Sequence, residues 1–126
     1  MTPVQVLVVD DEGELVSALA ERLALRGFSA RGVTSGEAAL ICLGEQSFDV
    51  VLVDVKMPGL GGLDLARAIR ASWPDQPVVL LTGHTSAEDV ATGNALGVAA
   101  YLMKPVDIEE LSSALRAAAT SHEVRT

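Results

Sequence analysis

The chain has 126 residues, of which 49% are hydrophobic and 21% are charged, and this length fits one domain with its own core. No apolar stretch approaches the ~20 residues of a membrane-spanning helix, so we expect a soluble protein. Nine basic residues against seventeen acidic ones give a net charge of -8, which argues against a phosphate-tracking nucleic-acid surface and favours protein partners.

The first part of the chain alternates strand-like and helix-like segments. A β-branched run at residues 4–9 predicts a strand, and leucines at helical spacing over residues 14–26 predict a helix that stops at Gly27. Residues 28–33 are a short and weaker strand candidate. Residues 34–37 (Thr-Ser-Gly-Glu) are typical of a helix N-terminus and predict a second helix after them.

Two further strand–helix pairs follow. Residues 48–53 predict a buried strand, and a loop rich in proline and glycine separates it from a helix over residues 63–72. Residues 77–81 predict the fourth strand. We expect the next helix, over residues 87–96, to be soft because Gly93 lies in its middle, where glycine costs about 1 kcal/mol relative to alanine.

The last pair completes the predicted fold. Residues 98–103 predict the fifth strand, and residues 107 to about 119 predict a closing helix with one apolar stripe. We expect residues 1–120 to form the domain, with residues 121–126 as a frayed end or the stump of a linker. Five strands that alternate with helices predict an α/β fold whose parallel sheet is covered on both faces and joined by right-handed crossovers.

Polar residues close the apolar runs of four predicted strands. They are Asp10, Asp11, Asp54, Thr82 and Lys104. Because the carboxyl ends of parallel strands lie at the same edge of a sheet, we expect these side chains to gather there. Four of them also have a simpler explanation: Asp11, with Glu14, suits a helix cap, Asp54 suits a turn, Thr82 suits a strand end, and Lys104 suits a solvated rim.

Together the three carboxylates create an electrostatic problem that the simpler explanations do not solve. Two carboxylates ~5 Å apart repel by roughly 3 kcal/mol at an effective dielectric constant of 20. The cluster must therefore raise a carboxyl pKa or bind a cation, and Lys104 offsets only part of the charge. Mg²⁺ prefers one or two carboxylates together with water and a phosphate. The residues thus predict Mg²⁺ and a phosphoryl group.

The motifs around these residues resemble those of the receiver domains of response regulators in two-component signalling, over nearly all of the chain. The matching segments are Val8-Val9-Asp10-Asp11-Glu12, Asp54 with Met57-Pro58-Gly59 and Gly62, Thr82-Gly83, and Tyr101-Leu102-Met103-Lys104-Pro105. The resemblance implies a flavodoxin-like, doubly wound (βα)5 fold with a five-stranded parallel sheet in the order 2-1-3-4-5.

The resemblance also implies a role for each polar residue. Asp54 would accept a phosphoryl group from a phosphohistidine of a sensor histidine kinase or phosphotransfer protein. The implied ligands of Mg²⁺, for which Mn²⁺ can substitute, are Asp10, Asp11, Asp54 and the backbone carbonyl of Lys56. The implied contacts of the phosphoryl group are Thr82, Gly83 and Lys104.

A conformational switch is implied by the same resemblance. Thr82 would move toward the phosphoryl group, and Tyr101 would turn inward into the space that it leaves. The Lys104-Pro105 peptide bond would be cis.

We expect a signalling domain rather than an enzyme, with only self-directed phosphotransfer and slow hydrolysis of its own acyl phosphate. Lys56 and His84 lie two residues beyond Asp54 and Thr82, and we hypothesise that they tune the phosphoryl lifetime; otherwise both are solvated residues at the rim. An aspartate-nucleophile phosphohydrolase is an alternative, but such enzymes usually carry a second aspartate where this chain has Lys56. The full acidic set disfavours a scaffold that is never phosphorylated.

The expected partners are proteins. The resemblance implies that the fourth helix, the fifth strand and the fifth helix contact a downstream protein or output domain, and it allows a homodimer that forms on phosphorylation. We expect no direct contact with nucleic acid or with a membrane. No leader-like segment precedes the first strand and Cys42 has no second cysteine to pair with, so we expect a cytoplasmic location.

Overall fold

Strands and helices alternate along the chain in the computed structural model, which describes residues 2–83 and 86–125 and the side chains of these residues up to residue 120. The described strands are β1 (Val4–Val9), β2 (Phe28–Val33), β3 (Val50–Asp54), β4 (Val78–Thr82) and β5 (Ala100–Met103). The described helices are α1 (Gly13–Ala24), α2 (Gly36–Glu45), α3 (Gly62–Ser72), α4 (Ala87–Ala95) and α5 (Ile108–Arg125). No helix in this part of the chain is long and apolar enough to span a membrane.

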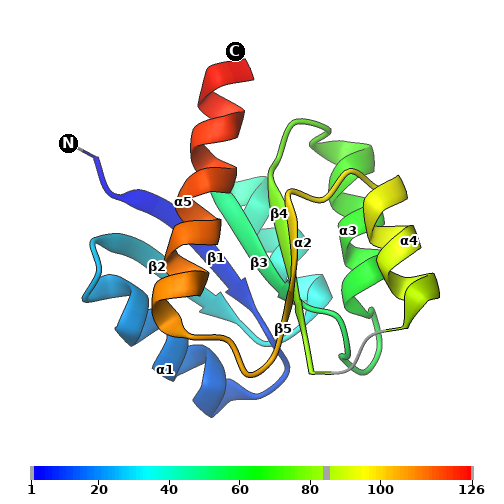
Figure 1. The fold of residues 1–126 in the computed structure, drawn as a ribbon, viewed down its shortest axis with the longest axis horizontal. Helices are drawn as coiled ribbons and strands as arrows, with labels where there is room; N and C mark the ends of the chain where they lie inside the picture. Colours follow the sequence, from blue (N-terminus) through cyan, green and yellow to red (C-terminus); the bar gives the residue numbers. More distant parts are fainter. Residues whose placement is uncertain (1, 84–85, 126) are drawn as a thin grey trace.

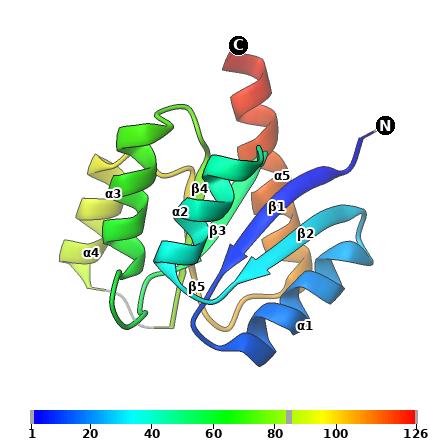
Figure 2. The same cartoon turned by 180° about the vertical axis from the view of Figure 1, so that it is seen from behind.

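The five strands form one parallel sheet in the order β2-β1-β3-β4-β5. Helices α1 and α5 lie on one face of this sheet, and α2, α3 and α4 lie on the other (Figures 1 and 2). The predicted α/β class and the strand order implied by the resemblance are therefore confirmed. Their cause is the alternation of strand and helix, because each parallel strand needs a crossover helix to return the chain to the same edge.

The two faces of the sheet hold two separate apolar layers. Leu52 and Leu81 pack with α1 and α5, whereas Val53 and Leu80, one residue away on the same two strands, pack with α2 and α3. Side chains that alternate between two covered faces make both faces apolar, which is why β3 and β4 read as continuous apolar runs. Cys42 is buried in the α2 side of the core, as a small hydrophobic residue would be.

The ends of several elements differ from the predicted ones in ways that matter for the polar residues. Asp54 and Thr82 are the last residues of β3 and β4, so the sheet itself fixes their backbones. The cap of α1 is Glu12, whose side chain makes no capping hydrogen bond, and the capping interpretation of Asp11 is therefore wrong. Ser35 does cap α2, since its hydroxyl accepts a hydrogen bond from the Ala38 N–H at 3.1 Å.

Helix α5 continues to Arg125, beyond the predicted end near residue 119. The apolar stripe that marks the helix in the sequence ends with its buried segment, which includes Leu111, Leu115 and Ala118. Beyond that segment the helix projects past the sheet (Figure 1). A stripe of buried residues marks only the part of a helix that packs, so it could not show where this helix stops.

Candidate functional site

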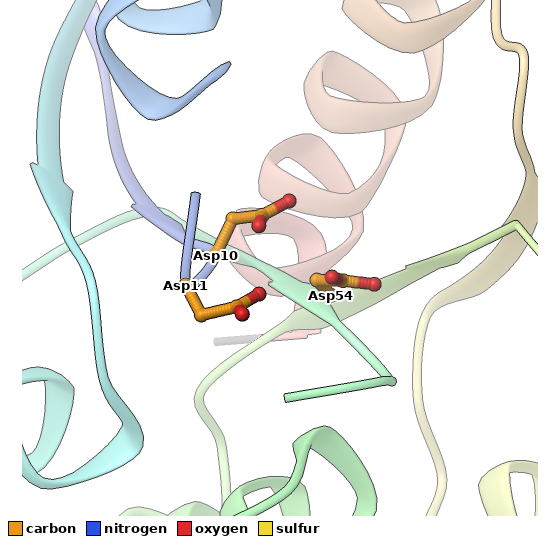
Figure 3. Close-up of side chains that lie close together, drawn as sticks. All are labelled: Asp10, Asp11 and Asp54. Atoms are coloured by element: carbon orange, nitrogen blue, oxygen red, sulfur yellow. The ribbon is translucent and has the colours of Figure 1, made fainter. Parts of the chain in front are cut away.

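Three aspartates meet at the carboxyl ends of two neighbouring strands. Asp10 and Asp11 follow β1, Asp54 ends β3, and the two strands are in register, with Val9 opposite Val53. One carboxylate oxygen of each aspartate lies within 4.8 Å of the others, and Figure 3 shows the Asp11 carboxylate pointing toward that of Asp54. Asp10 and Asp54 are only 2% and 7% exposed, whereas Asp11 faces solvent. The predicted acidic cluster is therefore present, and we call these three residues the acidic site.

Lys104 lies against the two buried members of the acidic site. Its Nζ is 3.5 Å from Oδ2 of Asp10 and 3.7 Å from Oδ2 of Asp54. One ammonium cannot balance three carboxylates, so two formal negative charges remain uncompensated. Oxygen ligands with a residual charge of this sign and size suit a hard divalent cation such as Mg²⁺.

Each buried carboxylate is held in place by a backbone N–H two residues further along the chain. Oδ1 of Asp10 accepts a hydrogen bond from the Glu12 N–H at 3.0 Å, and Oδ1 of Asp54 accepts a longer one, 3.4 Å, from the Lys56 N–H. Asx turns of this kind orient a carboxylate without using a second side chain. The other oxygen of each group, Oδ2, faces Lys104.

The pKa of Asp54 is raised above its ordinary value. Burial is the largest cause and the negative charge of Asp10 the next, while Lys104 and the Lys56 N–H act in the opposite direction. The carboxylate form of Asp54 is thus held at a cost, which a bound cation would lower because it favours the charged form. The donor set fits a divalent metal ion on this ground as well as on its geometry.

Gly62 lets the loop after β3 fold back closely on Asp54. The Gly62 N–H donates a hydrogen bond to the Val55 carbonyl at 3.0 Å. A Cβ atom at position 62 would overlap the Asp54 carbonyl oxygen and lie 2.6 Å from the Val55 Cα. Only glycine fits this approach, so Gly62 helps to hold the backbone that carries the Asp54 carboxylate.

Thr82 and Gly83 lie beside Lys104, as expected. Thr82 is completely buried at the end of β4, and its carbonyl accepts a hydrogen bond from the Lys104 N–H at 2.7 Å. A Cβ atom at Gly83 would lie 3.8 Å from the Lys104 Cδ. The peptide bond between Lys104 and Pro105 is cis, which confirms that expectation. The sheet therefore brings a hydroxyl residue, a glycine and a lysine next to the acidic site.

The side chains of Lys56 and Tyr101 have partners outside the acidic site. The side chain of Lys56 is 63% exposed, and its Nζ lies 3.7 Å from Oδ2 of Asp89, in the first turn of α4. Tyr101 is partly buried on β5 and packs against the core on the α3 side of the sheet. His84 lies outside the described residues.

Asp89 is the residue that the sequence analysis missed. An acidic residue in the first turn of a helix is ordinarily explained by the helix dipole, so nothing in the sequence marks Asp89 as a partner of Lys56. The ion pair links the loop after β3 to α4, which are far apart in the sequence.

The comparisons with known proteins agree on one family. A sequence model of the response regulator receiver domain matches residues 6–116. The chain is 36% identical over 121 residues to the uncharacterized transcriptional regulatory protein YkoG of Bacillus subtilis, covering 96% of this chain and 53% of that protein. It is also 36% identical to the response regulator MprA of Mycolicibacterium vanbaalenii, over 91% of this chain and 50% of MprA. The chain thus spans about half the length of the curated relatives it matches.

Solved structures give the same result. The crystal structure of a response regulator receiver domain protein from Clostridium thermocellum superposes with a TM-score of 0.92 at 31% sequence identity, covering 98% of this chain and 99% of that one. A CheY-like receiver domain protein from Methanospirillum hungatei reaches a TM-score of 0.93 at 22% identity and so supports the fold alone.

Proposed function

Because this chain belongs to the response regulator receiver domain family of two-component signalling, we propose that its acidic site is a phosphoryl-acceptor site with Asp54 as the acceptor. The observation that carries this proposal is the placement of the Asp54 carboxylate. It is nearly buried, lies within 4.8 Å of two other carboxylates and is 3.7 Å from the Lys104 ammonium. A carboxylate kept charged beside a lysine and a cation site is suited to attack phosphorus and to stabilise the charge that is transferred.

The proposed transfer is an in-line displacement. A carboxylate oxygen of Asp54 attacks the phosphorus of a phosphohistidine on a kinase or phosphotransfer protein, and the P–N bond breaks as the new P–O bond forms. The imidazole of the donor leaves with the electron pair and takes up a proton. Attack by a carboxylate gives an acyl phosphate, so the phosphoryl group is carried covalently by this chain.

Each neighbour of Asp54 has a proposed part in the transfer. The Lys104 ammonium pairs with phosphoryl oxygens, the Thr82 hydroxyl and the Gly83 N–H donate hydrogen bonds to them, and the ionised Asp54 carboxylate attacks without a general base. The proposed ligands of Mg²⁺, or of Mn²⁺ in its place, are Asp10, Asp11, Asp54 and the Lys56 carbonyl. When bound, the metal ion neutralises charge on the transferring oxygens.

Loss of the phosphoryl group is proposed to be slow and self-catalysed. The family is a signalling family, and hydrolysis of the acyl phosphate by water would reset the domain. We propose that Lys56 and His84 tune this rate. Support for Lys56 comes from its position two residues beyond the acceptor and its pairing with Asp89, which holds the ammonium near the loop. A half-life of the phosphorylated protein that is unchanged in both Lys56→Ala and His84→Ala would contradict this proposal.

The output is proposed to pass through α4, β5 and α5 to a downstream protein or output domain. Thr82 and Tyr101 would act as the switch, and a homodimer that forms on phosphorylation is part of the same proposal. The matched relatives are about twice as long as this chain, and one is described as a transcriptional regulatory protein. We propose that this domain serves a transcriptional regulator, without touching nucleic acid itself, and that it works in the cytoplasm, where the buried free thiol of Cys42 would stay reduced.

The proposal is tested by labelling with a small phosphodonor. The protein is incubated with acetyl phosphate and either Mg²⁺, Mn²⁺ or EDTA, and intact mass spectrometry is used to detect a gain of ~80 Da, the mass of one phosphoryl group. We expect labelling with either metal ion and none with EDTA. Asp54→Asn should abolish the adduct, whereas Asp64→Asn, which changes an exposed carboxylate on α3, should not.

Two results would overturn the proposal. A folded protein that never gains the adduct in Mg²⁺ would contradict the acceptor role of Asp54. Steady turnover of a small phosphomonoester would instead favour a phosphohydrolase.

A further inference from the structure

Gly93 lies in the middle of α4, directly against the ring of Tyr101. It is buried, and a Cβ atom added there would lie 3.2 Å and 3.3 Å from the Cδ2 and Cε2 atoms of Tyr101 and 3.4 Å from the Cδ1 of Leu80. Carbon atoms in comfortable contact are about 3.5–4.0 Å apart. The ring therefore occupies space that the side chain of any other residue at position 93 would need. We call the surface formed by Gly93 and Leu80 the Tyr101 seat.

The glycine is otherwise unfavourable where it stands. Glycine inside a helix is destabilising relative to alanine because it gains more backbone freedom on unfolding. Gly93 has no positive φ that would require glycine, unlike Gly97 two residues after the end of α4. The close approach of the Tyr101 ring is thus the structural reason for a glycine at this position.

Tyr101 is the less confined member of the contact. Leu80 is completely buried in a central strand and is confined by the core on the α3 side. Tyr101 is only partly buried, and it lies on β5, which is the edge strand of the sheet. An added methyl group at position 93 would therefore displace the ring toward solvent rather than displace Leu80.

The Tyr101 seat is connected to the acceptor site through β4. Leu80 is paired in register with Tyr101, and Thr82 lies two residues further along β4, so Leu80 and Thr82 share one face of that strand. The Thr82 carbonyl in turn accepts the hydrogen bond of the Lys104 N–H. Strand β4 thus joins Thr82, which is bonded to Lys104, to Leu80, which is paired with Tyr101.

We propose that Gly93 is a positioning residue for Tyr101. Because position 93 has no side chain, the Tyr101 ring can pack directly on the backbone of α4, and the position of the ring is thereby coupled to that of α4. The coupling to phosphorylation rests on the proposed function of Asp54, whereas the effect of Gly93 on the ring does not. Filling the seat shifts the ring outward and weakens its response to phosphorylation at Asp54.

The test uses the fact that Tyr101 is the only tyrosine of the chain. Biosynthetic 3-fluorotyrosine places one ¹⁹F label on the ring, and its NMR resonance and its H₂O-to-D₂O shift report the environment and solvent exposure of that ring. The variants are Gly93→Ala and, as the matched control, Asn94→Ala. The control also raises helix propensity within α4, but at an exposed position.

In Mg²⁺ without a phosphodonor, Gly93→Ala should move the ¹⁹F resonance and increase its solvent-induced shift, while Asn94→Ala should leave both unchanged. With acetyl phosphate, at equal labelling of Asp54 by mass spectrometry, the resonance of the parent protein should change more than that of Gly93→Ala. A Gly93→Ala ring indistinguishable from the parent ring, or an equal change in Asn94→Ala, would overturn the proposal. If Asp54 is never labelled, the proposed function fails, but the measurement without phosphodonor still decides the role of Gly93.

A stability comparison separates the ring contact from helix propensity. Gly93→Ala is introduced into the parent and into Tyr101→Ala, and the urea midpoints are compared. The alanine should raise the midpoint when the ring is absent and should raise it less, or lower it, when the ring is present. Equal shifts in the two backgrounds, or failure of Gly93→Ala to fold in both, would show that the ring does not set the requirement for glycine.

Discussion

Replacing Asp54 by asparagine should make the protein more stable in the absence of divalent cations. At an effective dielectric constant of 20, the Asp10 carboxylate within 4.8 Å repels that of Asp54 by about 3.5 kcal/mol, and Lys104 at 3.7 Å attracts it by about 4.5 kcal/mol. Exposed Asp11 adds a smaller, screened repulsion. These charge interactions nearly cancel, so the cost of burying a carboxylate whose side chain is 8% exposed remains.

Asparagine removes that cost and can accept the same N–H bond from Lys56, while Lys104 keeps its contact with Asp10 at 3.5 Å. We therefore expect Asp54→Asn to raise the free energy of unfolding by roughly 1–3 kcal/mol at pH 7.5 in EDTA. Urea titration followed by the fluorescence of Trp73, the only tryptophan, measures this difference. Asp64→Asn, at an exposed surface pair, should change it by less than about 0.5 kcal/mol.

The pH dependence gives the sign of the effect independently. The folded-state pKa of Asp54 lies above its ordinary value of 3.8, so the folded parent binds this proton more tightly than the unfolded chain does. The parent therefore loses stability as the pH rises from 3.8 through the raised pKa, and the advantage of Asp54→Asn should grow over the same window and vanish below it. Saturating Mg²⁺ should stabilise the parent more than the variant. An Asp54→Asn protein that is no more stable than the parent at pH 7.5 in EDTA would refute this reasoning.

Three other substitutions test separate parts of the site. Lys104→Met leaves the two buried carboxylates without their ammonium and should lower the free energy of unfolding by roughly 1–3 kcal/mol in EDTA. It should also slow the labelling of Asp54 at least about tenfold, which is 1.4 kcal/mol of barrier. An unchanged labelling rate, measured by mass spectrometry, would contradict the role of Lys104. Gly62→Ala should cost roughly 2 kcal/mol or more in urea titration because of overlap with the loop backbone, whereas Gly44→Ala in α2, where nothing lies within 4 Å of the added Cβ, should stabilise slightly. Asp89→Asn breaks the exposed ion pair between α4 and the loop after β3 and should change the free energy of unfolding by less than about 1 kcal/mol; a larger loss would mean that this pair helps to fix α4.

The acidic site could be predicted from the sequence because its residues directly follow or end strongly apolar strands, which are the clearest pattern in the chain. Asp54 and Thr82 close the most apolar strands, and the parallel arrangement alone brings strand ends together. The partner of Lys56 could not be predicted, because it depends on how α4 packs beside the loop after β3. In the sequence Gly93 predicts a soft helix, and only the packed structure shows the ring that lies against it. Residues whose role depends on contact between distant elements leave no local pattern.

The in-register pairing of β1, β3 and β4 also has a consequence for insertions and deletions. Val9 lies opposite Val53, and Asp54 lies opposite Leu81, so the acceptor is located by the number of residues in its strand. Because successive strand residues point to opposite faces, removing one residue from β3 would turn the acceptor toward the other helical layer and put a valine in its place. Lengthening the surface loops would leave that count unchanged. The length of each strand therefore determines where the acceptor lies, and insertions and deletions should be confined to the connections between the elements.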